Sequence, residues 1–270
     1  MTAVPRILIV AGSDSSGGAG IQGDIKTVTM MGGHAMTAVT AVTVQDTKGV
    51  SEIHPVPPAV VGAQVRAVLN DIGADMIKTG MLVDAATITA LLDALGDDDV
   101  PIVVDPVMVA KGGAQLLADD AVALMSERLL PRAQLITPNA PELGVLTGMA
   151  ITDPTTARIA ALRLSRRTGA MVLAKGGHLP GDTIVDWLVA RDGRVAHWEE
   201  ARINSRNTHG TGCTLASAIA TGLASGMEVW NAVDRARAYV REAIKAAPGF
   251  GKGNGPLGHA LGRPHFSTER

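Results

Sequence analysis

The sequence contains few of the residues that would place it in several large protein classes. Its single cysteine, Cys213, excludes a disulfide within the chain and fits a reducing compartment. Only 2% of the residues are aromatic, which leaves few rings to stack on unpaired bases. The 24 basic and 26 acidic residues give a net charge of −2, without the positive excess typical of DNA or RNA binding. We therefore expect no nucleic-acid partner.

Long hydrophobic runs are also missing. No stretch approaches the roughly 18 apolar residues of a membrane span, and the apolar run within residues 1–11 is too short for a signal peptide. We expect a cytoplasmic protein with no membrane partner. A chain of 270 residues that is 46% hydrophobic can bury a large core. We expect one domain over residues 1–270, with a glycine-rich tail from 248 to 270, and the sequence does not decide between a monomer and a homodimer.

Strand-like and helix-like patterns alternate along the chain. The expected strands are 7–11, 35–44, 75–79, 102–105, 134–137 and 171–175, followed by a hairpin of 183–190 and 194–197 that turns at Asp192-Gly193. The expected helices are 21–31, 59–72, 85–95, 118–130, 141–146, 157–168, 211–225 and 229–246. This alternation predicts an α/β fold with a mostly parallel sheet covered by helices on both faces. Ligands of such sheets bind at the carboxyl ends of the strands.

A glycine-rich loop over residues 12–23 follows the first expected strand. From Gly18 it contains a G-x-G-x-x-G pattern, the fingerprint of dinucleotide-binding dehydrogenases. That interpretation is unfavourable, because the pattern begins too far from the strand and because Asp14 and Asp24 would repel a pyrophosphate. We favour a substrate-binding loop in which Asp24 makes a polar contact. A loop that serves only the turn is the alternative.

A second glycine-rich segment, THGTGCT at 208–214, precedes an alanine-rich helix. Gly210 and Gly212 allow the backbone to direct its N–H groups toward one point, and the start of the helix adds positive charge, so the segment predicts an anion hole. Cys213 lies at the same helix start, where a thiolate is favoured. The alternative for this cysteine is an inert core residue.

Polar side chains end three of the expected strands. Asp105, Asn139 and Glu142 carry oxygen ligands suited to Mg²⁺, and Lys175 can meet a phosphate as a point charge. Taken singly, each residue is also a common turn former or helix cap. Parallel strands bring all of them to one edge, and beside an anion hole they point to phosphate chemistry. A Walker A motif is absent, so that chemistry is of another kind.

Seven segments together resemble the hydroxymethylpyrimidine/phosphomethylpyrimidine kinases of thiamine biosynthesis, a family of the ribokinase-like superfamily. They are AGSDSSGGAGIQGDIKT at 11–27, AVTVQDT at 41–47, KTGML at 78–82, DPVMVAKGG at 105–113, TPNAPE at 137–142, AKGGH at 174–178 and THGTGCT at 208–214. The resemblance extends from residue 7 to about residue 259. It implies a three-layer α/β/α, ribokinase-like fold, the use of ATP and Mg²⁺, and two successive phosphorylations of 4-amino-5-hydroxymethyl-2-methylpyrimidine.

The resemblance also implies roles for individual residues. The catalytic group comprises Cys213 as the base beside the hydroxymethyl group, the anion hole Gly210, Thr211 and Gly212, and Lys175. The ATP site comprises Lys175, Asn139, Asp105 and Thr211, and the Mg²⁺ site comprises Glu142 and Asp105. The pyrimidine pocket comprises Gly12, Asp24, Gln45, Met81 and Val107. Two residues depart from the family pattern: Gly23 stands where alanine is common, and Asp46 where asparagine is common.

Two other functions remain open at this point. A pyridoxal kinase of the same superfamily would use a similar site. A non-catalytic pyrimidine-binding sensor belongs to a different class, and the intact set of expected catalytic residues argues against it.

Overall fold

A mostly parallel sheet runs through the whole of the computed structural model, which describes residues 4–110 and 113–262. Its strands are β1 Arg6–Asp14, β2 His34–Gln45, β3 Val50–Pro55, β4 Met76–Thr79, β5 Ile102–Val104, β6 Ala133–Ile136, β7 Met171–Ala174, β8 Thr183–Val189 and β9 Val195–Ala201. They lie in the order β3-β2-β1-β4-β5-β6-β7-β8-β9. The strands from β2 to β7 in this order are parallel, and β3, β8 and β9 pair antiparallel.

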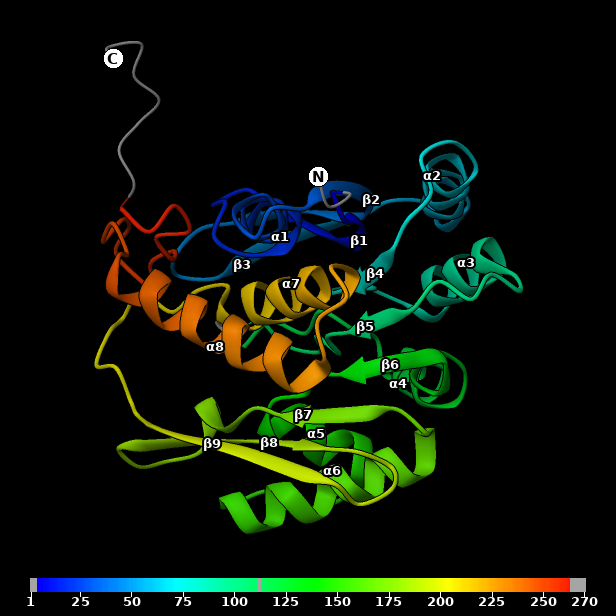
Figure 1. The fold of residues 1–270 in the computed structure, drawn as a ribbon. Coiled ribbons are helices and arrows are strands. Elements are labelled where there is room, and N and C mark those ends of the chain that lie inside the picture. The colour runs from blue at the N-terminus through cyan, green and yellow to red at the C-terminus, as the bar shows by residue number, and fades with distance from the viewer. Residues whose placement is uncertain (1–3, 111–112, 263–270) are drawn as a thin grey trace.

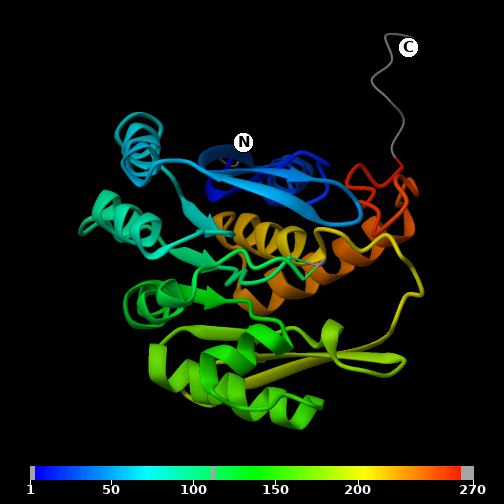
Figure 2. The same ribbon diagram turned by 180° about the vertical axis from the view of Figure 1, so that it is seen from behind.

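Helices cover both faces of the sheet (Figures 1 and 2). They are α1 Gly20–Met30, α2 Pro58–Asp71, α3 Ala85–Leu95, α4 Asp119–Leu124, α5 Ala140–Thr147, α6 Pro154–Thr168, α7 Thr211–Ala224 and α8 Val229–Lys245. In β1, Ile7 and Ile9 pack into the core under α1, α7 and α8, whereas Leu8 and Val10 pack into the core under α2 to α6. Alternate side chains point to opposite faces of a strand, so a strand buried on both faces is apolar throughout. The predicted three-layer α/β/α arrangement is confirmed.

Two elements differ from the sequence-based prediction. Strand β3 was not predicted, because most of its residues are exposed and it carries no apolar pattern; pairing with β2 at the sheet edge makes it a strand. The single helix predicted over 118–130 is divided into α4, a π-helical turn Met125–Leu129 and a 3₁₀ turn Leu130–Arg132. Pro131 has no N–H to donate, so a regular α-helix does not continue through it. The predicted hairpin of β8 and β9 is present.

The glycine-rich tail packs against the body of the protein as far as residue 262, where the described residues end. Thr47, just after β2, accepts hydrogen bonds from the Gly253 N–H at its hydroxyl (3.1 Å) and from the Asn254 N–H at its carbonyl (2.7 Å). A Cβ on Gly251 would collide with the Thr47 side chain, so close packing explains this glycine. The extent of the domain, 1–270, stays a prediction. None of the described helices is long and apolar enough to cross a membrane.

Candidate active site

The polar residues at the strand ends meet at the carboxyl edge of the sheet. The Lys175 ammonium, just after β7, lies 2.8 Å from Oδ1 of Asp105, just after β5. The Thr137 hydroxyl, which follows β6 between them, donates to the same oxygen at 3.0 Å. Despite burial, the charges of Lys175 and Lys78 hold the pKa of Asp105 below its usual range. A parallel sheet thus assembles a charged pair from residues 70 positions apart.

Asn139 and Glu142 form a capping box at the start of α5. The Asn139 amide oxygen accepts from the Glu142 N–H at 2.9 Å, and the Glu142 carboxylate accepts from the Asn139 N–H at 2.8 Å. The helix-cap interpretation of both residues is therefore correct, and it does not prevent a second role. Burial and the nearby Asp105 raise the pKa of Glu142 to about 7, although Lys175 acts against them. Glu142 is thus a carboxylate whose charge a nearby cation would stabilise.

The segment predicted to form an anion hole lies at the start of α7. Gly210 is the N-cap residue, with φ 85°, a conformation that glycine adopts readily. A Cβ on Gly210 would also collide with the Gly18 carbonyl, because the two glycine-rich loops touch here. A Cβ on Gly212 would lie 3.3 Å from Lys175 Nζ and 3.7 Å from Asp105 Oδ2. The first turn of α7 therefore faces the Lys175–Asp105 pair directly.

Cys213 follows in the same turn and is partly exposed. Burial raises the pKa of its thiol to about 11, and the charges of Asp24 and Asp105 contribute in the same direction. Lys78 and the Gly20 N–H lower the pKa of the thiol, but by less than burial and the two carboxylates raise it. The prediction that a thiolate is favoured here is wrong for the ligand-free protein, because desolvation and two carboxylates outweigh the favourable influences of Lys78 and the Gly20 N–H.

Asp24 does not lie at the open surface of the site, where a substrate contact was predicted. Its carboxylate is fully buried and binds Lys78 Nζ through both oxygens, at 2.9 and 2.8 Å. The Ser217 hydroxyl of α7 also donates to it at 2.7 Å. Sequence reasoning missed Lys78 as its partner, although a lysine inside the four-residue apolar strand β4 was a usable signal.

Three of the expected pocket residues lie in or just after β1, β4 and β5. Gly12 lies in β1 near its end, and a Cβ there would lie 3.1 Å from the sulfur of Met81. The Met81 carbonyl accepts from the buried Thr40 hydroxyl at 2.7 Å, which fixes the chain after β4. Val107 is half-buried two residues after Asp105. The Met81 side chain therefore packs directly against Gly12.

Gln45, at the end of β2, belongs to a network that the sequence did not predict. Its amide oxygen accepts from the Thr43 hydroxyl at 3.1 Å, and its amide nitrogen lies 3.3 Å from His209 Nε2. His209 Nε2 in turn lies 2.8 Å from Asp14 Oδ2. Burial opposes ionisation of Asp14, but hydrogen bonds from His209, Ser16 and the backbone hold its pKa at about 2. Asp14, expected only to repel a dinucleotide, is thus the anchor of the loop.

Comparison with known proteins identifies the family. The model of the phosphomethylpyrimidine kinase family matches residues 14–258. The chain belongs to this family.

Two curated relatives and two solved structures support the same assignment. A hydroxymethylpyrimidine/phosphomethylpyrimidine kinase of Streptomyces coelicolor is 48% identical, over 96% of both chains. A thiamine biosynthesis bifunctional protein of Geobacter sulfurreducens is 52% identical over 94% of this chain, which spans only 52% of that protein. Phosphomethylpyrimidine kinase from Clostridium difficile superposes with a TM-score of 0.78 at 36% identity, covering 90% of this chain and 100% of that one. Bacillus subtilis pyridoxal kinase superposes with a TM-score of 0.89 at 32% identity, covering 96% and 98%. The fold is therefore ribokinase-like, and the protein is a phosphotransferase.

The donor set fits the Mg²⁺ that phosphomethylpyrimidine kinases are expected to use. Among the described residues no three His, Cys, Asp or Glu side chains gather as metal ligands. Asp105 and Glu142 provide two carboxylates, and their mutual repulsion contributes to the raised pKa of Glu142. Mg²⁺ is commonly held by one or two carboxylates together with waters and substrate phosphates. These two residues would hold such an ion through its hydration shell and the nucleotide.

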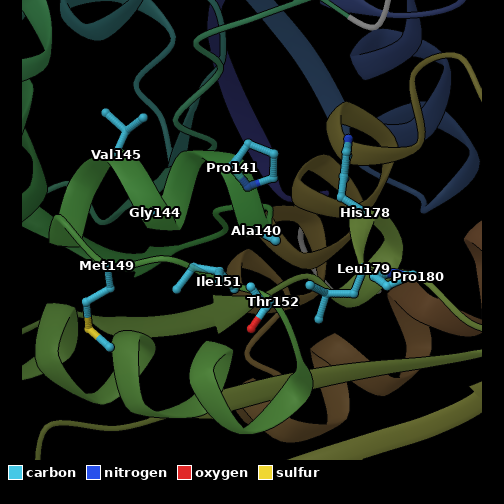
Figure 3. A pocket seen from close by; sticks show the side chains of 10 residues that line it. All are labelled: Ala140, Pro141, Gly144, Val145, Met149, Ile151, Thr152, His178, Leu179 and Pro180. Carbon is cyan, nitrogen blue, oxygen red and sulfur yellow. The ribbon is translucent and has the colours of Figure 1, made fainter.

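One pocket lies beside the phosphomethylpyrimidine kinase site rather than in it. A pocket of about 560 Å³ opens between the start of α5, the loop after α5 and the turn after β7, with Pro141 and His178 facing each other across it (Figure 3). It is lined by Ala140, Pro141, Gly144, Val145, Met149, Ile151, Thr152, His178, Leu179 and Pro180. None of these residues belongs to the expected site. A small cleft of about 10 Å³ lies between Gln45–Gly49, Ala110, His209 and Asn254, at the edge of the expected pyrimidine pocket.

Proposed function

We propose that this protein transfers a phosphoryl group from ATP to the hydroxymethyl oxygen of 4-amino-5-hydroxymethyl-2-methylpyrimidine, and then phosphorylates the resulting monophosphate, in thiamine biosynthesis. The observation that carries the proposal is the meeting of two sets of groups at one sheet edge. The first turn of α7 faces Lys175 and Asp105, and Gln45 joins the same α7 entry loop through His209. An anion site and a carboxamide thus lie on either side of one loop.

In-line phosphoryl transfer needs positioning and charge stabilisation more than covalent help. The N–H groups of Gly210, Thr211 and Gly212 would bind the oxygens of the transferring group, where preorganised donors act most strongly. Lys175 would exchange its contact with Asp105 for a phosphate oxygen. Mg²⁺, when bound, would neutralise phosphate charge beside Asp105 and Glu142.

Cys213 would receive the proton that leaves the hydroxymethyl oxygen. Only its thiolate form can accept a proton, and with a pKa near 11 that form is a small fraction of the ligand-free protein. A base is needed only late in the transfer, when the oxygen already bonds to phosphorus. The cations that face Cys213 therefore determine how much of the competent form exists.

The second phosphorylation requires the first phosphate to turn and become the nucleophile. The pyrimidine ring would stay between Met81 and Gln45 while its phosphate replaces the hydroxyl at the anion hole. The glycines of the two touching loops leave the backbone free of side chains at this place. We further propose that the protein is cytoplasmic, and that its assembly, if it is not a monomer, is a homodimer.

Phosphorus NMR of the purified protein with ATP, Mg²⁺ and hydroxymethylpyrimidine tests the proposal. We expect the monophosphate to appear first and the diphosphate to follow. The matched control is Cys213→Ala, which should keep ATP binding and lose about 10²–10⁴-fold in kcat. Accumulation of the monophosphate alone, with excess ATP and long incubation, would contradict the two-step reaction.

A pyridoxal kinase is the second candidate, favoured by the TM-score of 0.89 with Bacillus subtilis pyridoxal kinase. The same phosphorus NMR assay, with pyridoxal in place of the pyrimidine, decides between the two activities. A higher kcat/KM for pyridoxal would make this second activity the principal one.

A further inference from the structure

Lys78 is a fully buried side chain at this edge whose charge the proposed reaction does not use. It stands in β4, directly before the strand ends, and its exposed fraction is 0%. Its ammonium binds Asp24, also 0% exposed, whose two oxygens lie 2.9 and 2.8 Å from Nζ. The Coulomb attraction of Asp24 raises the pKa of Lys78 although burial acts against it, so the ammonium stays charged.

The pair lies directly beneath the catalytic turn of α7. Ser217, which donates to Asp24 at 2.7 Å, is one helical turn after Cys213 and therefore on the same face of the helix. The charge of Lys78 acts on Cys213 and on Asp105, and it is the strongest of the influences that favour the Cys213 thiolate. The ammonium thus faces the part of the site where the proposed reaction places a base.

Stability alone gives little reason to keep this pair. Two charges removed from water lose their hydration, and a buried ion pair replaced by apolar groups of similar volume is often as stable or more stable. The neighbouring glycine is fitted to the lysine, because a Cβ on Gly80 would lie 3.2 Å from Nζ. The local structure therefore accommodates a charged group at this point.

We propose that Lys78 is a positioning residue of the phosphoryl-transfer site, whose buried positive charge stabilises negative charge at Cys213. The inference rests on the proposed function. Without Lys78 the thiol would face two carboxylates, Asp24 and Asp105, and its ionised form would be favoured by the Gly20 N–H and by the charge of Lys175. Asp24 holds the ammonium in place and limits its effect.

The proton balance of the step is complete. The hydroxymethyl oxygen forms its bond to the γ-phosphorus while the bond from that phosphorus to the leaving ADP oxygen breaks. The hydroxyl proton passes to the Cys213 thiolate, which becomes a thiol and later returns the proton to water. Lys78 exchanges no proton in this sequence; it supplies a fixed charge.

The rate of Cys213 alkylation by iodoacetamide, measured against pH with EDTA present, tests the inference without substrate or metal. Lys78→Met should move the alkylation midpoint upward, with about a tenfold lower rate below it for each pH unit moved. Asp24→Asn removes a negative charge and leaves the ammonium, so it should move the midpoint downward. The double variant removes both charges and should return close to the wild-type midpoint. Lys245→Met, at an exposed lysine paired with Glu242, is the matched control and should move nothing.

Opposite shifts in the two single variants would support the inference, because loss of packing would disturb both in the same direction. Equal shifts, or none, would overturn it. If Lys78→Met does not fold, Asp24→Asn and the double variant still carry the comparison: an unmoved midpoint in Asp24→Asn would then overturn it. A wild-type protein that alkylates as expected but phosphorylates no pyrimidine would refute the proposed function and leave this result standing.

Discussion

Two lysine–aspartate pairs stand at the same sheet edge and differ in one respect. Lys78–Asp24 joins β4 to α1 with both side chains 0% exposed, whereas Lys175–Asp105 joins the ends of β7 and β5 with exposed fractions of 13% and 2%. The closest nitrogen–oxygen distance is 2.8 Å in both. The first pair is closed to ligands, and the second opens toward the anion hole.

Two ion pairs with the same nitrogen–oxygen distance can therefore have different roles when their exposure differs. In an open pair the ammonium can leave its carboxylate for an incoming phosphate, because the phosphate offers it another negatively charged partner. A closed pair can exchange with nothing, so it contributes a constant field. Substitution in the closed pair should therefore cause the larger loss of stability, and substitution in the open pair the larger loss of turnover relative to stability.

The largest expected effect is on the stability of the closed pair. Lys78→Met leaves the Asp24 carboxylate buried without its cation, which commonly costs about 3–5 kcal/mol of unfolding free energy. Urea unfolding followed by circular dichroism measures it. Pairing the change with Asp24→Asn should recover most of the loss, and a single variant as stable as wild type would show that the pair is not charged.

Lys175→Ala should affect turnover instead. Removing one preorganised charge that stabilises a transition state commonly lowers kcat about 10²–10³-fold. The unfolding midpoint should change far less than in Lys78→Met, because Lys175 is 13% exposed and its removal would admit water to the Asp105 carboxylate, whereas Lys78 is fully enclosed. Steady-state kinetics and urea unfolding of the same samples measure both. A stability loss as large as that of Lys78→Met would remove the distinction between the pairs.

Gln45 belongs to neither ion pair, so its substitution should change substrate specificity and leave both pairs intact. Its amide can offer a donor and an acceptor to the ring nitrogen and amino group of an aminopyrimidine. Pyridoxal lacks that edge and would leave a buried polar group unpaired at a cost of about 1–3 kcal/mol, or roughly 10- to 100-fold. Gln45→Leu should narrow the ratio of kcat/KM for the two substrates by this factor. An unchanged ratio would place Gln45 outside the pocket.

The smallest effect concerns Glu142, the carboxylate beside the open pair. Its pKa is about 7 in the folded protein and lies above the ordinary value of 4.5, so the folded state binds the extra proton between these values. Its contribution to stability is present below pH 4.5 and is lost as the pH rises through 7. In Glu142→Gln this part of the decline in Tm should disappear, and Mg²⁺ should stabilise the variant less than wild type at pH 8. Parallel Tm curves for the two proteins would contradict the assignment.

The order of strands and helices could be predicted because buried parallel strands are apolar runs and their helices are amphipathic. The edge strand β3 could not, since exposed residues such as Glu52 carry no such pattern and only pairing with β2 makes the segment a strand. The starts of α5 and α7, with proline or glycine nearby, were predicted closely, whereas α6 begins at Pro154, before the predicted start at residue 157.

The residues of the site could largely be predicted from the sequence, but which of them form ion pairs could only partly be predicted. Strand-end polar residues point to one edge, so the meeting of Lys175 with Asp105 follows from a parallel sheet. The partnership of Lys78 with Asp24 depends on how α1 packs on β4, which periodicity does not encode. The ionisation of Cys213 depends on burial and on these same unseen carboxylates, so a rule about helix starts gave the wrong direction.

The packed tail has a consequence for how the protein folds during its synthesis. The His209 N–H donates to the Gly255 carbonyl, and the Thr214 hydroxyl of α7 lies 3.0 Å from a ring nitrogen of His259. Thr47 accepts hydrogen bonds from the backbone of the segment 253–254. Both glycine-rich loops are synthesised before the segment 253–259, which contacts the second loop and α7. A nascent chain could thus bury most of its core before these contacts form. The core would then fold first, and the site would be completed only when this segment packs.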